Sequence, residues 1–480
     1  MRLDRILSDA DVYQRPDDAR KIDVLALTEV LDEVKPGSLF FCVVGGRRDS
    51  HDFAGEAAAR GAVAVVVERD VDANVPQVRV NNVRAAMASM AATFYEHPAR
   101  RMHMFAVTGT NGKTTTTHIL QAILQKHRWN TEVIGTLTSV YTTPPSILLQ
   151  KQLAAFRDNR VQAVAMEASS FAMDQHRVDA IRFDVGVFTN LTQDHLDYHG
   201  TMNKYFEAKA VLFEPGRVET AVINVDDEWG RKLLDRVAVP VEPFSLVNAK
   251  DLRVTPNGSE FTWNGHRVRI PLFGQFNVYN ALAAMTAARA VNIPMETIIE
   301  ALAELPQVPG RMEMVRKGQP FGVVVDFAHT PDGLENALRA TRLYVGERGR
   351  VLVVFGCAGD RDKEKRPITA EIMERLADEV IITTDNVRSE DPATIINEML
   401  AGMVDSSRAH VYLDRRVAIN QAIAHARPGD VVLIAGKGHE ATQEIQGVKH
   451  PFLDAAVAGE AVDLWLAAHD ARSGPRGDAS

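Results

Sequence analysis

The sequence has few cysteines, no long apolar run and no excess of positive charge. Its 480 residues include only Cys42 and Cys357, which argues against a disulfide framework and favours a reducing compartment. No stretch approaches the roughly 20 apolar residues that a membrane helix needs, and the start of the chain lacks the apolar segment of a signal peptide. The net charge of −9 argues against a general nucleic-acid binder. We therefore expect a cytoplasmic protein without membrane insertion.

The remaining composition is that of an ordinary globular protein. Hydrophobic residues make up 46% of the chain and charged residues 24%, so a core can form without disulfides or metals. The length predicts about three domains, and we expect a monomer. In the first unit, residues 1–98, apolar runs at 39–44 and 62–67 flank a helical stretch at 53–61. This pattern predicts a small N-terminal α/β domain.

Two larger α/β units are expected to follow, at residues 99–309 and 310–480. In the central unit, helical stretches alternate with apolar runs, which predicts a doubly wound, mostly parallel sheet with strands at 104–107, 163–166, 185–188 and 220–223. Residues 251–272 predict a β-hairpin with an Asn264-Gly265 turn, and a helix pair should follow. In the last unit, apolar runs predict a Rossmann-like α/β domain with strands at 322–326, 350–356, 379–384 and 430–436. The polar tail, 470–480, is predicted to be disordered.

Residues 108–115 read Thr-Gly-Thr-Asn-Gly-Lys-Thr-Thr between a predicted strand and a predicted helix. This context indicates a phosphate-binding loop, because backbone N–H groups and the helix dipole meet the phosphates there. Lys113 can reach the β- and γ-phosphates, and Thr114 can ligate Mg²⁺. A glycine turn without a ligand is the weaker alternative. The predicted nucleotide-binding residues are Gly109, Thr110, Asn111, Gly112, Lys113, Thr114 and Thr115.

Two further groups of side chains follow strands of the same unit. Glu167 closes one strand, where a carboxylate suits Mg²⁺ beside phosphates, although a helix-capping role is equally open. Residues 190–200 hold two histidines and two aspartates, including His195, and such density in a loop favours a site. Lys209 lies on a predicted helix and would by itself be read as a solvated lysine.

Together these motifs resemble the Mur ligase family, and the resemblance covers nearly the whole chain. The matching segments are 108–115, 167–170, 190–200, 274–280, 310–313 and 326–332. The segments 355–363, 385–388 and 436–440 are most similar to members that add the third residue of the peptidoglycan peptide.

The resemblance implies a reaction sequence. ATP would convert a carboxylate into an acyl phosphate, and an amine would then displace phosphate to give an amide. The resemblance assigns catalysis to Lys113, Glu167, His195 and Lys209, and Mg²⁺ to Thr114, Glu167, His195 and a carbamylated Lys209. It assigns further nucleotide contacts to Asn277, Arg311, Asp326 and His329.

The implied substrates are small molecules. The acceptor would be UDP-N-acetylmuramoyl-L-alanyl-D-glutamate, with its peptide near Thr142, Thr143, Ser169, Gln175 and Arg177 and its uridine end near Gly46 and Arg47. The amine would be meso-diaminopimelate, whose second carboxylate distinguishes it from lysine and requires a cation. The residues available for this end are Arg361, Asn386, Arg388, Gly436 and Glu440.

Three departures from the family pattern leave alternatives open. Val387 replaces a proline in the segment Asp385-Asn-Val-Arg388, Phe171 replaces a histidine, and residues 30–32 read Val-Leu-Asp instead of Asp-Ser-Arg. A lysine-adding ligase, or a related ligase acting on another carboxylate, therefore stays possible. A P-loop ATPase switch that ligates nothing is the alternative from a different class.

Overall fold

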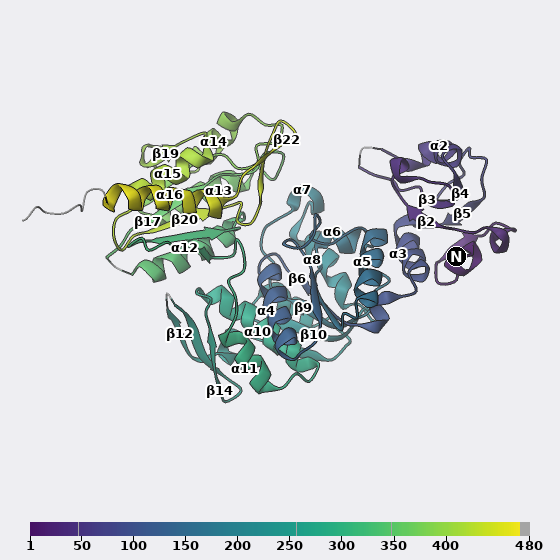
Figure 1. The fold of residues 1–480 in the computed structure, drawn as a ribbon, viewed down its shortest axis with the longest axis horizontal. Helices are drawn as coiled ribbons and strands as arrows, with labels where there is room; N and C mark the ends of the chain where they lie inside the picture. The colour runs from purple at the N-terminus through teal and green to yellow at the C-terminus, as the bar shows by residue number, and fades with distance from the viewer. Residues whose placement is uncertain (47, 256, 347, 471–480) are drawn as a thin grey trace, which may run out of the picture.

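The computed structural model describes residues 1–46, 48–255, 257–346 and 348–470. Three α/β units follow one another along its long axis, with the N-terminal and C-terminal units at opposite ends of the central one (Figure 1). Two sequence predictions, Arg47 and the tail beyond residue 470, lie outside the described residues. The α/β fold class with a central parallel sheet is confirmed.

The N-terminal unit has a five-stranded sheet in the order β1-β5-β4-β3-β2, parallel except for the edge strand β1. The valine-rich run 62–67 forms β4 and is buried on both faces, as parallel strands covered by helices are. The elements are α1 Leu3–Ile6, β1 Val12–Gln14, β2 Ala26–Thr28, β3 Ser38–Phe41, α2 Ala54–Ala59, β4 Ala62–Val67, β5 Gln77–Val80 and α3 Val83–Phe94.

The central unit has a six-stranded, fully parallel sheet in the order β11-β10-β9-β6-β8-β7. Its carboxyl edge positions the phosphate loop after β6 and Glu167 at the end of neighbouring β8. The elements are β6 His103–Thr108, α4 Lys113–Lys126, β7 Thr131–Ile134, α5 Ser146–Asp158, β8 Ala163–Glu167, α6 Ser170–Asp174, β9 Phe183–Phe188, α7 Leu196–His199, α8 Met202–Ala210, β10 Val218–Asn224, α9 Glu228–Leu234 and β11 Val241–Phe244.

A small antiparallel sheet and two helices complete this unit. The predicted Asn264-Gly265 turn joins β13 to β14, and both turn residues have positive φ, at +47° and +82°. The alanine-rich face of α10 packs against α4 in one core cluster, so it braces the helix that carries the phosphate loop. The elements are β12 Lys250–Thr255, β13 Gly258–Trp263, β14 His266–Ile270, α10 Gln275–Ala290 and α11 Met295–Ala303.

The C-terminal unit has a six-stranded sheet in the order β15-β16-β20-β17-β18-β19, parallel except for the short edge strand β15. Helices α12 and α13 pack on one face, and α15 and α16 pack on the other. The elements are β15 Glu313–Met314, β16 Gly322–Asp326, α12 Pro331–Val345, β17 Val351–Phe355, α13 Lys365–Leu376, β18 Glu379–Ile382, α14 Pro392–Leu400, β19 Ala409–Val411, α15 Arg415–His425, β20 Val431–Ala435, β21 Thr442–Ile445, β22 Val448–Pro451 and α16 Asp454–Asp470.

The predicted domain limits near residues 98 and 309 stay predictions, although one large sheet falls within each of the three parts. Across the described parts of the chain, no helix combines the length and the hydropathy that crossing a bilayer requires.

Candidate active site

The phosphate loop adopts a conformation that only glycine tolerates at two positions. Gly109 has φ of +146° and Gly112 has φ of +87°. A Cβ at residue 109 would lie 1.9 Å from Thr189 Oγ1, and one at residue 112 would lie 2.3 Å from Asn280 Oδ1. The loop then enters α4 at Lys113, so its N–H groups and the helix N-terminus share one side. This geometry suits an anionic ligand.

Two lysines, the half-buried Lys113 and the buried Lys209, converge on the carbonyl oxygens of this loop. Lys113 Nζ donates to Gly109 O and Thr110 O at 2.9 and 2.8 Å, and Lys209 Nζ donates to Gly109 O at 2.9 Å. Burial lowers the pKa of Lys113, although the Glu167 and Asp194 carboxylates oppose the shift. Burial and the Lys113 charge hold the pKa of Lys209 well below its ordinary value. Lys209 is therefore not the solvated lysine that its helix alone suggested.

Thr114 and Glu167 form a pair of oxygen ligands beside the loop. Thr114 Oγ1 donates to Glu167 Oε1 at 3.0 Å, and the same carboxylate accepts the backbone N–H of Thr136 at 2.8 Å. Arg311, from the start of the C-terminal unit, donates from Nη2 to Thr114 Oγ1 at 2.9 Å. Gly135 is required here, because a Cβ there would lie 2.4 Å from Glu167 Oε1.

This donor set fits Mg²⁺. Mg²⁺ keeps several waters and takes one or two protein oxygens together with substrate phosphates, rather than a complete protein cage. In the described residues no group of three or more His, Cys, Asp or Glu side chains gathers at metal-binding distance. A hydroxyl and a carboxylate beside a phosphate loop are consistent with such an incomplete cage. The predicted metal roles of His195 and Lys209 stay predictions.

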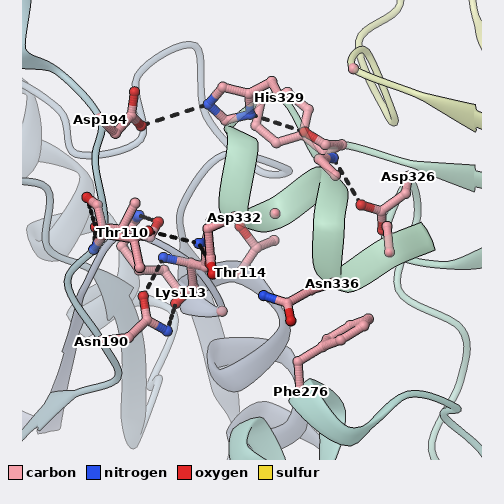
Figure 2. A pocket seen from close by; sticks show the side chains of 18 of the residues that line it. Thr110, Lys113, Thr114, Asn190, Asp194, Phe276, Asp326, His329, Asp332 and Asn336 are labelled. Carbon is pink, nitrogen blue, oxygen red and sulfur yellow. Dashed lines mark hydrogen bonds and ion pairs between the residues drawn. The ribbon is translucent and has the colours of Figure 1, made fainter. Parts of the chain in front are cut away.

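Asp194 joins the loop after β9 to the C-terminal unit. His195 Nε2 lies 3.4 Å from Asp194 Oδ2, and His329 Nε2 faces the same oxygen at 3.8 Å (Figure 2). Although burial alone would raise it, the pKa of Asp194 is lowered, chiefly by the facing His329 ring and also by Lys365. Burial lowers the pKa of His195 to about 4, so this imidazole stays neutral and can donate an electron pair near pH 7.

A further contact closes the two units around the phosphate loop. Asn111 Nδ2 donates to Asp332 Oδ2 at 2.8 Å, from the loop to the first turn of α12 (Figure 2). Asp326, at the end of β16, accepts the backbone N–H groups of Met312 and Ala328, and burial raises its pKa. Apart from Gly109 and Asn277, the nucleotide-binding candidates of the two units therefore line one cleft.

The nucleotide candidate on α10 lies away from the cleft. The predicted contact Asn277 is buried and does not line the cleft, since its amide donates to Phe273 O at 2.9 Å and accepts from Asn280 Nδ2 at 3.0 Å. Asn280, one helical turn later on α10, lines the cleft instead, as does Phe276. The i, i+3 spacing of Asn277 and Asn280 is the sequence signal that could have identified this alternative.

The predicted acceptor residues form a wall beside β8. Thr143 Oγ1 donates to Glu167 O at 2.7 Å and lies 3.2 Å from Ser169 Oγ. Arg177 donates from Nη1 to Thr143 O at 2.6 Å and from Nη2 to Gln175 Oε1 at 2.7 Å. Thr142, Thr143, Ser169 and Arg177 line the cleft, whereas Gln175 lies behind Arg177 and orients it. Phe171 also lines the cleft and makes an edge contact with His195 at 4.9 Å between ring centres.

The predicted amine-end residues gather after the strands of the C-terminal unit. Asn386 Nδ2 donates to Glu440 Oε2 at 2.8 Å. Arg388 lies nearby with φ of +51°, donates from Nη1 to Gly359 O, and is held by backbone bonds to the β21 hairpin. Val387 is buried, and its backbone packs tightly on Gly359, where a Cβ would lie 2.0 Å from Val387 O. This packing holds the segment without the proline of the family pattern.

These groups line one cleft of about 1600 Å³, which runs from the phosphate loop to Arg361, Asn386, Arg388, Gly436 and Glu440. Gly46 lies apart from it, in an exposed loop of the N-terminal unit. Sequence reasoning left Asp194, Asp332, Tyr205 and Asn280 out of the predicted site, although all of them line the cleft. Asp194, Asp332 and Asn280 stand inside motifs quoted above, which was the available signal.

Comparison with known proteins gives matches along the chain. The descriptions "Mur ligase family, catalytic domain", "Mur ligase middle domain" and "Mur ligase, glutamate ligase domain" match residues 32–95, 107–288 and 310–438. A UDP-N-acetylmuramoyl-L-alanyl-D-glutamate–2,6-diaminopimelate ligase of Geobacillus thermodenitrificans (strain NG80-2) is 46% identical over 466 residues, covering 92% of this chain and 95% of that protein.

Solved structures agree in fold. A structure of a UDP-N-acetylmuramoyl-L-alanyl-D-glutamate–2,6-diaminopimelate ligase has a TM-score of 0.69 at 31% identity and covers 97% of this chain and 99% of its own. A MurF ligase from Thermotoga maritima in complex with ADP has a TM-score of 0.63 at 21% identity, over 94% and 99% of the two chains, and supports the fold alone. From the sequence matches and the full-length structural likeness together, this chain is a member of the Mur ligase family.

Proposed function

We propose that this protein is the ATP-dependent, ADP-forming ligase that adds meso-diaminopimelate to UDP-N-acetylmuramoyl-L-alanyl-D-glutamate in peptidoglycan precursor synthesis. The observation that carries the proposal is a single cleft with a phosphate loop at one end and both Arg388 and Glu440 at the other. Relatives that carry this name match the chain over nearly its whole length. The reaction uses small molecules, and we propose that the protein performs it as a cytoplasmic monomer.

The phosphate loop and the residues around it serve the nucleotide. The N–H groups at residues 109–114 and the Lys113 ammonium bind the β- and γ-phosphates, and Arg311 reaches the same place from the C-terminal unit. Lys113 must leave the carbonyl oxygens of Gly109 and Thr110 to do so, which costs little because it exchanges one set of oxygen acceptors for another. Asn280, Phe276, Asp326 and His329 line the cleft, and we assign them to the rest of the nucleotide.

The acceptor carboxylate and the γ-phosphate are both anionic, so the wall between them must neutralise charge. Bound Mg²⁺ supplies that charge and polarises the phosphoryl oxygens when Thr114 and Glu167 hold it. Arg177 suits the acceptor peptide, since its guanidinium is already oriented by Gln175 and Thr143. Phe171 and Tyr205 line the cleft near His195, where their apolar rings exclude water from an acyl phosphate.

Lys209 is a candidate for carbamylation. Carbon dioxide adds to a neutral amine, and the lowered pKa of Lys209 increases its neutral fraction. The product is a carboxylate, formed with release of one proton, beside the half-buried Lys113 ammonium, which then gains an anionic partner. Carbon-13 bicarbonate gives a direct test: a protein-bound carbamate resonance is expected with the natural chain and not with Lys209→Met. A spectrum without that resonance in the natural chain contradicts carbamylation.

The end of the cleft that would bind the amine favours an amino acid with a second carboxylate. Arg388 and Arg361 supply cations, and Glu440 with the Gly436 carbonyl can hold an ammonium beside them. Lysine carries the ammonium but leaves the cations unpaired, which penalises it.

The test is an amine panel, with the UDP-muramoyl dipeptide as acceptor and phosphate release as readout. We expect release only when acceptor and amine are both present, and strongest with meso-diaminopimelate. Equal or better use of lysine would support the lysine-adding alternative. Phosphate release independent of both substrates would favour an ATPase switch and refute the ligase.

A further inference from the structure

We propose that Lys437 is a positioning residue that sets the polarity of the amine-binding pocket without touching the amine. This inference rests on the proposed function and adds a specificity element to it. Lys437 lies two residues beyond the end of β20, its side chain has no exposed surface, and it is absent from the cleft lining. Its neighbours Asp385, Asn386, Gly436 and Glu440 do line the cleft. A buried cation directly behind the pocket requires an explanation.

The hydrogen bonds of Lys437 account for all three of its donors. Nζ donates to Glu440 Oε2 at 2.9 Å, to Thr442 O at 2.8 Å and to Asn386 Oδ1 at 3.2 Å. An ammonium has three N–H groups, so no donor remains for a substrate. Asp385 Oδ1 lies 3.9 Å away and adds a second negative charge near the same cation. Lys437 therefore acts through other residues.

The first consequence concerns the orientation of the Asn386 amide. Its Oδ1 accepts from Lys437 Nζ and from the backbone N–H of Glu444 at 2.9 Å. Two donors on one side fix the oxygen there, so the NH₂ group points toward Glu440 and the cleft. A donor in that position, beside Arg388, suits a substrate carboxylate. Without Lys437 only the Glu444 N–H would hold this oxygen, so the amide orientation would be fixed less firmly.

The second consequence concerns Glu440. Its Oε2 accepts from both Lys437 and Asn386, and neither of these bonds uses Oε1. The Glu440 side chain lines the cleft and is 35% exposed. The carboxylate is thereby held in one rotamer, with one oxygen directed at an incoming ammonium. The Lys437 charge also offsets Asp385 and Glu440 together, so the pocket does not repel an amino acid that carries two carboxylates.

Lys437→Met keeps the length and removes the charge and the donors. We expect the KM for the preferred amine to rise about tenfold or more, because a charged pair and an amide orientation are lost together. The KM values for ATP and for the UDP-muramoyl dipeptide should change less than about twofold, since no bond of Lys437 reaches either site. Use of lysine relative to meso-diaminopimelate should increase, because the carboxylate-binding end loses its fixed donor.

Arg350→Met is the matched control. Arg350 pairs with Asp430 at 2.7 Å in the same unit, but it precedes β17 and lies at the opposite edge of the sheet. The Arg350→Met variant should have a lower melting temperature but no selective rise in the KM for the amine. An unchanged amine KM in folded Lys437→Met, or an equal rise in all three KM values, would overturn the proposal.

Lys437→Gln provides the second variant if the methionine variant does not fold. It retains one NH₂ donor but no charge, and the same selective rise in KM is expected, with the same contrary outcomes. The amine in these assays is whichever one the natural enzyme prefers. A natural enzyme that rejects meso-diaminopimelate therefore contradicts the proposed substrate and leaves the role of Lys437 to be decided by its own variants.

Discussion

Arg388 provides the sharpest test of how the amine is selected. Its backbone N–H donates to Glu444 O at 3.1 Å and its carbonyl accepts from Gln446 N at 2.6 Å, so the backbone holds φ at +51° whatever the side chain. The guanidinium makes one bond, to Gly359 O, and lies 3.8 Å from Glu444. Arg388→Met should therefore cost only about 1 kcal/mol of folding stability. The main loss should fall on the substrate carboxylate.

A hydrogen bond between charged groups is worth about 1.5–3 kcal/mol, which corresponds to a change of roughly 10- to 150-fold in affinity. The Arg388 side chain is 23% exposed, so solvent screening favours the lower half of that range. We expect the KM for meso-diaminopimelate to rise about 10- to 50-fold in Arg388→Met, with the KM for ATP unchanged. The KM for lysine should not rise, because lysine has no second carboxylate.

Steady-state phosphate release at saturating acceptor measures all of these constants. Arg416→Met is the control, since Arg416 pairs with Glu460 on the surface of the same unit, away from the cleft. Equal rises in KM for lysine and meso-diaminopimelate would refute carboxylate recognition by Arg388, as would no rise for either.

Lys113→Met should reduce turnover by at least about 100-fold, because the variant loses the cation at the transferring phosphate. Near-normal turnover in a folded variant would contradict the phosphate-binding role of this loop. Lys209→Met should lose activity that added short carboxylates partly restore, and failure of every carboxylate to rescue would count against an anionic residue 209. Burial, and then the Arg311 charge, lower the pKa of His439 to about 4. Between pH 6.5 and 4 the unfolded chain therefore binds more protons at this residue than the folded chain, and the free energy of unfolding falls as pH falls. His439→Gln should flatten that acid-side loss in melting experiments, and an unchanged slope would contradict this.

Local patterns in the sequence predicted much of the fold. The strand, glycine loop and helix at 103–126 are specified by residues close in sequence, and so is the Asn264-Gly265 turn, whose two positive φ values few other residue pairs accept. The order of strands in each sheet depends on packing between distant segments, so periodicity could not supply it.

The site could be predicted where a residue acts within its own motif. Thr114, Glu167 and the loop glycines lie where their motifs indicated. Which face of α10 meets the loop depends on how that helix packs, so Asn277 was predicted at the nucleotide where Asn280 lines the cleft. Lys437 stands between two glycines in the sequence, and only the tertiary fold brings Asn386, Glu440 and Thr442 around it.

In the proposed reaction, phosphoryl transfer activates a carboxylate of the acceptor in this cleft. Acceptor dipeptide labelled with oxygen-18 in its terminal side-chain carboxylate tests that step directly. If the carboxylate attacks the γ-phosphate and the amine then displaces phosphate, one labelled oxygen must pass into the released inorganic phosphate. We predict labelled phosphate in an amount equal to the amide formed. Unlabelled phosphate would show that ATP is hydrolysed by water, and it would contradict the ligase mechanism.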